Sequence, residues 1–194
     1  MTDSTDADSS ARRGKRERLI DSACELLYSQ GIARTTLAEI SEAANVPLGN
    51  VYYYFKTKDA IVEAVVEART EQLRGATAAL QRKHGTPKTR LKALVGMLAE
   101  ERDMIADHGC PFGTLCTDLS KQSGEANPLT APLIQTLLDW AEQQFRALGL
   151  HDASDLAVEL LVAYQGSAVL TNALGDPEVM TREARRIEKW ISAL

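Results

Sequence analysis

The sequence predicts an all-α fold of about nine helices, and three observations support this prediction. Apolar residues recur at intervals of three and four residues along most of the chain, as on one face of a helix. We find no alternating run of β-branched residues that would indicate a strand. Aromatic residues make up only 5% of the 194 residues, so Leu, Ala, Val and Ile must build the core, which favours closely packed helices.

The chain begins with a predicted disordered tail, residues 1–12, which is rich in Ser, Asp and Thr. The first helix is expected to start near Arg13 and to stop at Gly31, because glycine readily adopts the backbone conformation that ends helices. Its inward stripe is predicted to be Ile20, Ala23, Cys24 and Leu27.

Two short helices should follow, joined by a tight turn at Asn45 and Val46. Thr36 and Glu39 have the spacing of a capping box, which predicts the start of the second helix. Pro47 is suited to the start of the third helix, because the first amide of a helix has no partner within it. The inward stripe of the second helix is predicted to be Leu37, Ile40, Ser41 and Ala44.

Four consecutive aromatic residues, from Tyr52 to Phe55, occupy the third helix. Val51 and Phe55 are four residues apart and can both face inward. At about 100° per residue, Tyr53 then points away from that face, while Tyr52 and Tyr54 flank it. Two short helices with an outward aromatic face are typical of a DNA-binding helix-turn-helix, in which phenol groups can contact phosphates and bases. The alternative is that these tyrosines, Tyr54 above all, pack against the next helix or another part of the chain.

A long fourth helix is predicted from Thr57, as its N-cap, to about residue 82, with Asp59 in its first turn. Glycine, proline and serine then separate five further predicted helices. These lie at about 88–107, 112–122, 129–148, 153–174 and 177–193. The predicted organisation is therefore a three-helix helix-turn-helix domain over residues 13–60 and a larger helical bundle over residues 61–194.

Charge is distributed unevenly along the chain, whose net charge is −5. Residues 12–58 hold eight basic and five acidic residues, so this segment is basic on an otherwise acidic protein. The imbalance suggests two tasks in one chain, although a solvated basic arm is an equally good explanation.

Several classes of protein are disfavoured by composition. The three cysteines are an odd number without zinc-ligand spacing, and the three histidines are scattered, so we expect neither a disulfide framework nor a metal site. We predict no cofactor. The polar N-terminus lacks a secretory signal and no apolar run spans a membrane, which predicts a cytoplasmic protein.

The segment from Arg16 to Val65 resembles the N-terminal domain of the TetR family of bacterial transcriptional regulators. The resemblance rests on the run TTLAEISEAANVPLGNVYYYFKTKDAIVEAV, in which the Thr-Thr start, the Ala-x-x-Val turn, the Gly-x-x-Tyr-x-x-Phe helix and the Lys-x-Lys occur in order. It covers about 50 residues. It implies a homodimer that binds a palindromic operator in double-stranded DNA and responds to a small-molecule effector, typically as a repressor.

The resemblance also implies roles for individual residues in DNA binding. Thr36 caps its helix and reaches a phosphate, and Lys58 contacts another phosphate. Ala38 and Pro47 depart from common family residues, an arginine that reads guanine and a capping serine. The expected DNA-binding residues are Thr36, Pro47, Leu48, Asn50, Tyr52, Tyr53, Tyr54 and Lys58. A basic arm could add phosphate or minor-groove contacts through Arg12, Arg13, Lys15 and Arg16.

The last two predicted helices offer a dimer interface. The helix at 153–174 is apolar around much of its circumference, and Gly166, Ser167 and Ala168 would let a partner helix approach closely. The last helix adds apolar residues at Ile187, Trp190, Ile191 and Leu194. The alternative is that these helices form only the core of one subunit.

The effector pocket is harder to predict, because each candidate residue also suits an ordinary core. The absence of obvious buried charge suggests an apolar effector. The candidates for ligand binding are Met97, Met104, Cys110, Phe112, Leu115, Leu137, Trp140 and Tyr164.

Two alternatives to a ligand-responsive regulator remain. Cys110 precedes Pro111 at a predicted helix N-terminus, a position that favours the thiolate and would suit a sensor of oxidants or electrophiles. Cys116 is expected in the core. The second alternative, a helical enzyme of the cytosol, lacks any catalytic motif, so we predict that the protein is not an enzyme.

Overall fold

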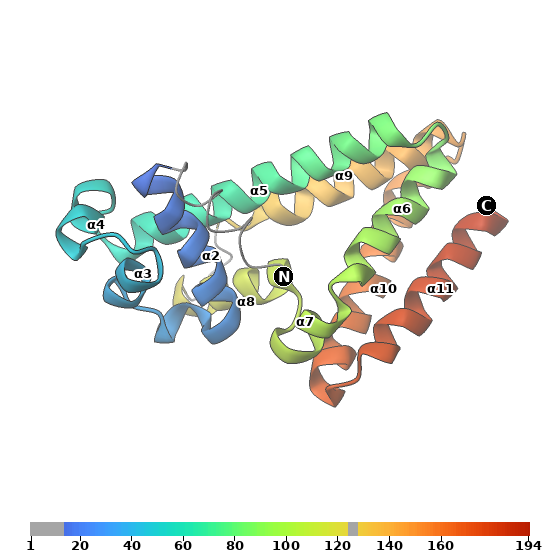
Figure 1. Ribbon diagram of the computed structural model, residues 1–194. Coiled ribbons are helices and arrows are strands. Elements are labelled where there is room, and N and C mark those ends of the chain that lie inside the picture. The colour runs from blue at the N-terminus through green and yellow to red at the C-terminus, as the bar shows by residue number, and fades with distance from the viewer. Residues whose placement is uncertain (1–13, 124–127) are drawn as a thin grey trace, which may run out of the picture. The chain divides into compact units, whose positions relative to one another are not determined.

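A computed structural model describes residues 14–123 and 128–194, and helices make up nearly all of this part of the chain (Figure 1). The predicted tail at residues 1–12 lies outside the described residues, as does Arg13. The helices are α2 (Lys15–Arg34), α3 (Leu37–Ala43), α4 (Leu48–Tyr54), α5 (Lys58–Lys83), α6 (Pro87–Glu100), α7 (Arg102–His108), α8 (Pro111–Ser123), α9 (Ala131–Ala147), α10 (Ala153–Leu174) and α11 (Pro177–Ala193).

The chain divides into two compact units, Met1–Ala68 and Arg69–Leu194. Both this division and the predicted boundary at residue 60 fall inside α5, which runs from one unit into the other. None of the helices in the described ranges has the length and hydrophobicity needed to cross a membrane.

In the first unit, α2, α3 and α4 pack on one another around a small aliphatic core. Gly31 adopts φ 80° and interrupts the helical backbone, as predicted, but α2 ends at Arg34, three residues beyond the predicted stop. The hydroxyl of Thr35, which is buried, donates a hydrogen bond to the Gly31 carbonyl at 2.9 Å and fixes this corner. Cys24, predicted on the inward stripe, is partly exposed. The core residues are Leu19, Ile20, Ala23, Leu27, Ile32, Ile40, Val46, Val51 and Phe55.

In the second unit, α10 lies at the centre and packs against α7, α9 and α11, while α6 contacts both α9 and α11. Each helix turns an aliphatic face inward, as its spacing predicted. The largest fully buried side chains of this core are Leu91, Leu94, Ile105, Leu133, Leu137, Phe145, Met180 and Ile191.

The single helix predicted at 88–107 is wrong, because the chain breaks at Glu101 into α6 and α7. Glu101 adopts φ −85° and ψ 12°, and its amide donates to the Ala99 carbonyl. No glycine or proline marks this break. It allows α6 to pack on α9 and α11 while α7 packs on α10 and α11, so tertiary packing outweighs a continuous helical pattern.

Candidate nucleic-acid interface

The start of α3 is fixed by the predicted capping box. The Glu39 amide donates to the Thr36 hydroxyl at 3.2 Å, and the Thr36 amide donates to the Glu39 carboxylate at 2.8 Å. The Thr36 hydroxyl also donates to that carboxylate at 2.8 Å. These bonds, the side-chain one first, lower the pKa of Glu39 below its ordinary value. Thr36 is exposed but is held by Glu39 in this structure.

The turn between α3 and α4 depends on Asn45, which has φ 49°. Asparagine tolerates this left-handed conformation better than most residues. The Val46 amide donates to the Ser41 carbonyl at 3.0 Å, and the buried Ser41 hydroxyl donates to the Val46 carbonyl at 2.6 Å. The angle between the two helices is therefore set by a closed pair of hydrogen bonds.

The two faces of α4 confirm the predicted orientation of its aromatic run. Val51 is 0% exposed and Phe55 3%, so both belong to the core. Tyr53 is 76% exposed and Tyr52 48%, and the Tyr53 and Tyr54 rings meet edge to face at 5.0 Å. This edge-to-face contact is a favoured aromatic geometry and helps to order the exposed rings.

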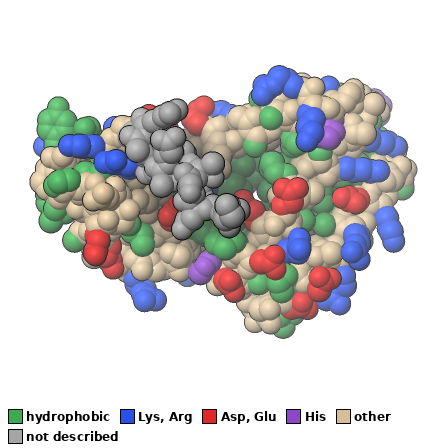
Figure 2. Space-filling model, in the orientation of Figure 1, with side chains coloured by type: hydrophobic (Ala, Val, Ile, Leu, Met, Phe, Trp, Pro, Cys, Tyr) green, Lys and Arg blue, Asp and Glu red, His purple; other side chains and the backbone are tan. Residues whose placement is uncertain are grey.

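Exposed apolar and aromatic side chains gather over α4, with basic side chains beside them (Figure 2). Pro47 is exposed just before the helix, Leu48 is exposed in its first turn and Asn50 is partly exposed. Gly49 is also exposed, and a Cβ added there would meet no atom within 4 Å. The backbone at the start of α4 is therefore open to close approach.

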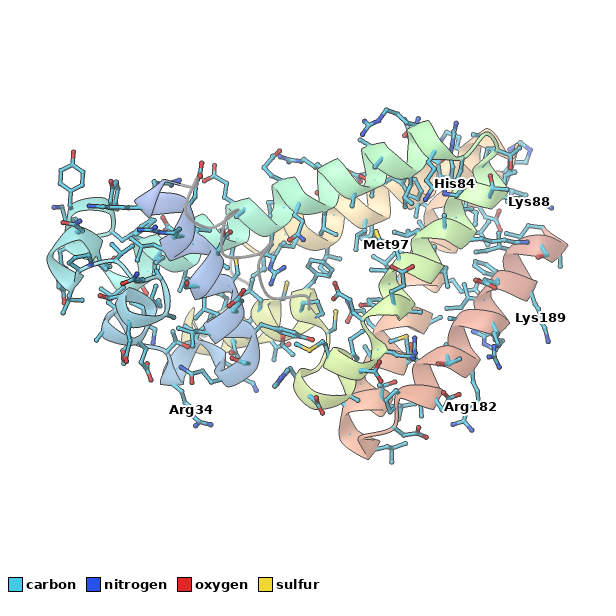
Figure 3. All side chains as sticks on the ribbon, in the orientation of Figure 1. Arg34, His84, Lys88, Met97, Arg182 and Lys189 are labelled. Carbon is cyan, nitrogen blue, oxygen red and sulfur yellow. The ribbon has the colours of Figure 1, made fainter. Side chains whose placement is uncertain are left out.

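Basic residues border this surface. Lys58 opens α5, where Thr57 acts as the predicted cap by accepting a hydrogen bond from the Ala60 amide at 3.1 Å. The Lys58 ammonium donates to the Ala33 carbonyl at 3.4 Å, which holds it near the end of α2. Arg34 projects outward from the end of α2 (Figure 3).

One contact in this region was missed by sequence reasoning. The Arg16 guanidinium, considered only as part of a basic arm, lies 5.5 Å from the centre of the Phe55 ring. This cation–π contact ties the start of α2 to the end of α4. No local pattern signals it, because the two residues are far apart in the sequence.

Three of the eight predicted effector residues line pockets of the second unit, and each of the three lines a different one. Trp140 lines an open groove of about 590 Å³ between α5 and α9. Tyr164 lines a void of only about 10 Å³ among α6, α10 and α11. Cys110 lines a groove of about 380 Å³ between α8 and α10.

The other five candidates line none of these three pockets. Leu115 and Leu137 are buried in the core, and Phe112 is partly exposed. Met97 is partly exposed on α6 (Figure 3). Met104 is 48% exposed on α7. The structure therefore does not gather the eight predicted residues around one cavity.

Cys110 sits at the start of α8, as predicted. Its sulfur lies 3.6 Å from the Tyr164 hydroxyl and accepts a hydrogen bond from the Gly113 amide at 3.4 Å. None of the three cysteines forms a disulfide in the described part of the chain, and Cys110 is buried. Burial raises the pKa of the partly buried Cys116 thiol to about 11, so Cys116 stays protonated at neutral pH.

The two helices predicted to form a dimer interface are α10 and α11, and their apolar residues separate into two groups. One group is buried within its own subunit and includes Leu160, Ile187 and Ile191. The other is exposed along α10, and we call it the α10 stripe: Val158, Val162, Val169, Leu170 and Leu174. The outward face of α11 is instead charged, with Arg182 and Lys189 pointing away from the helix (Figure 3).

Two short helices joined by a tight turn, with the second helix exposing polar aromatic groups, define a helix-turn-helix domain. A family model described as "Bacterial regulatory proteins, tetR family" matches residues 19–65, which contain this motif. This N-terminal part of the chain is similar to the DNA-binding domain of that family.

Among individual relatives, the HTH-type transcriptional regulator BetI of Escherichia coli (strain K12 / DH10B) is 36% identical over 86 residues. That match covers 42% of this chain and 43% of BetI, so it spans less than half of the relative. The family and this relative are transcriptional regulators and not enzymes, in agreement with the prediction.

Solved structures extend the likeness of fold to almost the whole chain. A TetR transcriptional regulator from Legionella pneumophila superposes with a TM-score of 0.81 at 15% identity, over 91% of this chain and 97% of that one. The reduced form of NemR from E. coli gives a TM-score of 0.77 at 18% identity, over 91% and 96% of the two chains. At these identities the comparison shows a shared all-α fold.

Proposed function

We propose that this protein is a dimeric DNA-binding repressor of transcription, released from its operator by a small molecule. The observation that carries the proposal is the exposed face of α4, on which three adjacent tyrosines, Leu48 and Asn50 surround an open backbone at Gly49. An exposed apolar patch of this kind is unfavourable in water and usually marks a binding surface. A major groove admits a helix, offers phosphates to phenol hydroxyls and offers thymine methyl groups to apolar atoms.

In the proposed dimer, α4 of each copy binds one half of a palindromic operator. The α10 stripe supplies the apolar surface for self-association, and two-fold symmetry in the protein matches two-fold symmetry in the DNA. At Gly166, in the middle of α10, an added Cβ would meet no atom within 4 Å, so a partner helix can approach closely there.

In this proposal the effector binds within the second unit of each subunit. It changes the spacing between the two α4 helices of the dimer and so lowers affinity for the operator, because an effector shifts the equilibrium only as far as it binds one state better. As a regulator of transcription the protein would act in the cytoplasm, with the DNA.

A gel-shift assay on the DNA upstream of the protein's own gene tests DNA binding. We expect a complex at low salt that weakens as salt is raised, because phosphate contacts release counterions. Competition with unrelated DNA separates a specific complex from general charge attraction. No shift with any flanking fragment at low salt would contradict the proposal.

A second candidate function, a thiol-switched repressor, is favoured by one observation. Cys110 lies at the start of α8, and its sulfur accepts a hydrogen bond from the Gly113 amide at 3.4 Å. Its burial opposes reaction with reagents in solution. In gel shifts with and without hydrogen peroxide, a thiol switch predicts release of wild-type protein and no response of Cys110→Ser. Equal responses of the two proteins would exclude it.

A further inference from the structure

A groove of about 380 Å³ runs between α8 and α10 in the second unit. This volume is within the range of small-molecule sites. One wall is formed by the side of α8 that carries Cys110, Thr114, Thr117 and Lys121, and the other by the side of α10 that carries Gln165 and Val169. The sequence did not predict this groove, because most of the residues proposed for the effector pocket were apolar residues of the bundle.

The amide of Gln165 is the distinctive group in this groove. Its nitrogen is buried, and it finds no hydrogen-bond partner in the part of the chain that the structure describes. The amide is held close to α8 because residue 113 is glycine, where an added Cβ would lie 2.8 Å from the Gln165 oxygen. A buried donor without a partner costs free energy, which a bound acceptor would recover. The groove therefore favours a ligand that presents an oxygen acceptor.

The charged groups of the groove narrow the class of ligand. Lys121 lines it and provides a cation. Asp118 also lines the groove, but it is engaged in an interaction of its own. An amide donor and an ammonium group together suit a carboxylate, while Val169 and Ala173 offer apolar surface to the remainder of the ligand.

The groove is continuous with the α10 stripe, because Val169 belongs to both. Val169 is 66% exposed in the single chain and would be covered if a second copy packed on the stripe. We infer that the groove between α8 and α10 binds a small carboxylate, and that α10 of a second copy closes it. This inference rests on the proposed dimer and places the effector site at its interface.

Isothermal titration calorimetry of the full-length protein with hexanoate, hexanamide and hexylamine tests the ligand class. We expect saturable binding of hexanoate, at least tenfold weaker binding of hexanamide, and none of hexylamine. Lys121→Gln is expected to remove the preference for hexanoate over hexanamide. No saturable binding of hexanoate, or equal binding of the acid and the amine, would overturn the inference.

Two variants test the location. Gln165→Leu is expected to weaken hexanoate binding at least tenfold, whereas Gln143→Leu, the same change in the separate groove between α5 and α9, leaves it unchanged. Thr117→Trp fills the groove from an exposed position, so it should abolish binding while the circular dichroism spectrum and the melting temperature stay the same. Binding that survives both Gln165→Leu and Thr117→Trp would refute the site.

Val162→Glu separates the groove from the dimer, because Val162 lies on the α10 stripe but does not line the groove. If this variant sediments as a monomer, its affinity for hexanoate should fall at least tenfold. Unchanged affinity in that monomer would refute closure by the second copy. A monomeric wild type would instead refute the proposed dimer, and a wild-type dimer without hexanoate binding would refute the groove while the dimer stands.

Discussion

The two units of the chain expose apolar side chains of different chemistry. The first unit exposes tyrosines on the short helix α4, which combine a ring with a hydroxyl, and basic side chains lie beside this helix (Figure 2). The second unit exposes the α10 stripe, which is made only of valine and leucine. Aliphatic surface gains from contact with another aliphatic surface, whereas a phenol next to basic groups suits a partner rich in phosphate.

One chain can therefore present two interfaces that favour different partners. A tyrosine keeps its hydroxyl hydrated while it is free, so its exposure costs less than that of leucine. The α10 stripe has no such polar group and gains most from being covered. We therefore expect changes on α10 to affect assembly and changes on α4 to affect DNA binding alone.

The largest effect is expected for Val162→Glu on α10. A carboxylate placed in an apolar interface must be desolvated, so we expect dimer affinity to fall by about two orders of magnitude. DNA affinity should fall with it, because two linked half-sites become one. Sedimentation equilibrium measures the first change and gel shift the second.

Ala79→Glu is the matched control, because Ala79 is exposed on α5 and lies outside the α10 stripe. It should leave the dimer intact. A dimer that persists in Val162→Glu would show that the α10 stripe has another use.

Tyr53→Ala is expected to weaken DNA binding by an order of magnitude or more, while the dimer and the melting temperature are unchanged. Tyr53 is mostly exposed, so its loss removes little from the core. Fluorescence anisotropy with labelled operator measures the affinity. Tyr53→Phe distinguishes the ring from the hydroxyl: a loss equal to that of alanine assigns the effect to the hydroxyl. Wild-type affinity in Tyr53→Ala would contradict the role of α4.

Thr36→Ala removes the cap of α3 and should lower the free energy of unfolding by about 1 kcal/mol. Thr36→Ser keeps the hydroxyl and is the control.

The pKa of Glu39 is lowered in the folded protein, so its stabilising effect is complete above pH 4.5 and is lost as pH falls through the folded-state pKa. The difference in melting temperature between wild type and Glu39→Gln should therefore shrink below pH 4.5. A constant difference would show that the capping box does not act through the carboxylate.

Gly49→Ala is expected to have the smallest effect, with opposite signs on stability and binding. An added methyl group meets open space and favours the helix, so stability should rise by up to about 1 kcal/mol. DNA affinity should fall several-fold if the backbone at the start of α4 approaches the DNA closely. Chemical denaturation and anisotropy measure the two quantities. If stability and DNA affinity both rise, the DNA does not approach the backbone at Gly49 closely.

Sequence reasoning succeeded where local rules determine the structure. The orientations of Phe55 and Tyr53 follow from the angle between successive residues of a helix, and the box at Thr36 follows from spacing alone. The interruption of the helical backbone at Gly31 also depends only on the conformational freedom of one glycine.

Sequence reasoning was weaker where distant elements meet. Nothing near Glu101 signals a break, which lets α6 pack on α9 and α11 while α7 packs on α10 and α11. The groove at Gln165 depends on the approach of α8 to α10 at Gly113, two residues far apart in the chain. Hydrophobicity identified Leu137 as buried, but it could not distinguish a core position from a pocket wall.

Photo-crosslinking tests the central claim, that α4 lies against the operator, most directly. The photoreactive amino acid p-benzoylphenylalanine replaces Tyr53 in one sample and Ala79 in another, and each complex with operator DNA is irradiated. The account predicts a covalent protein–DNA adduct from position 53, mapped to both half-sites, and none from position 79. A complex that forms but gives no adduct from position 53 would contradict it.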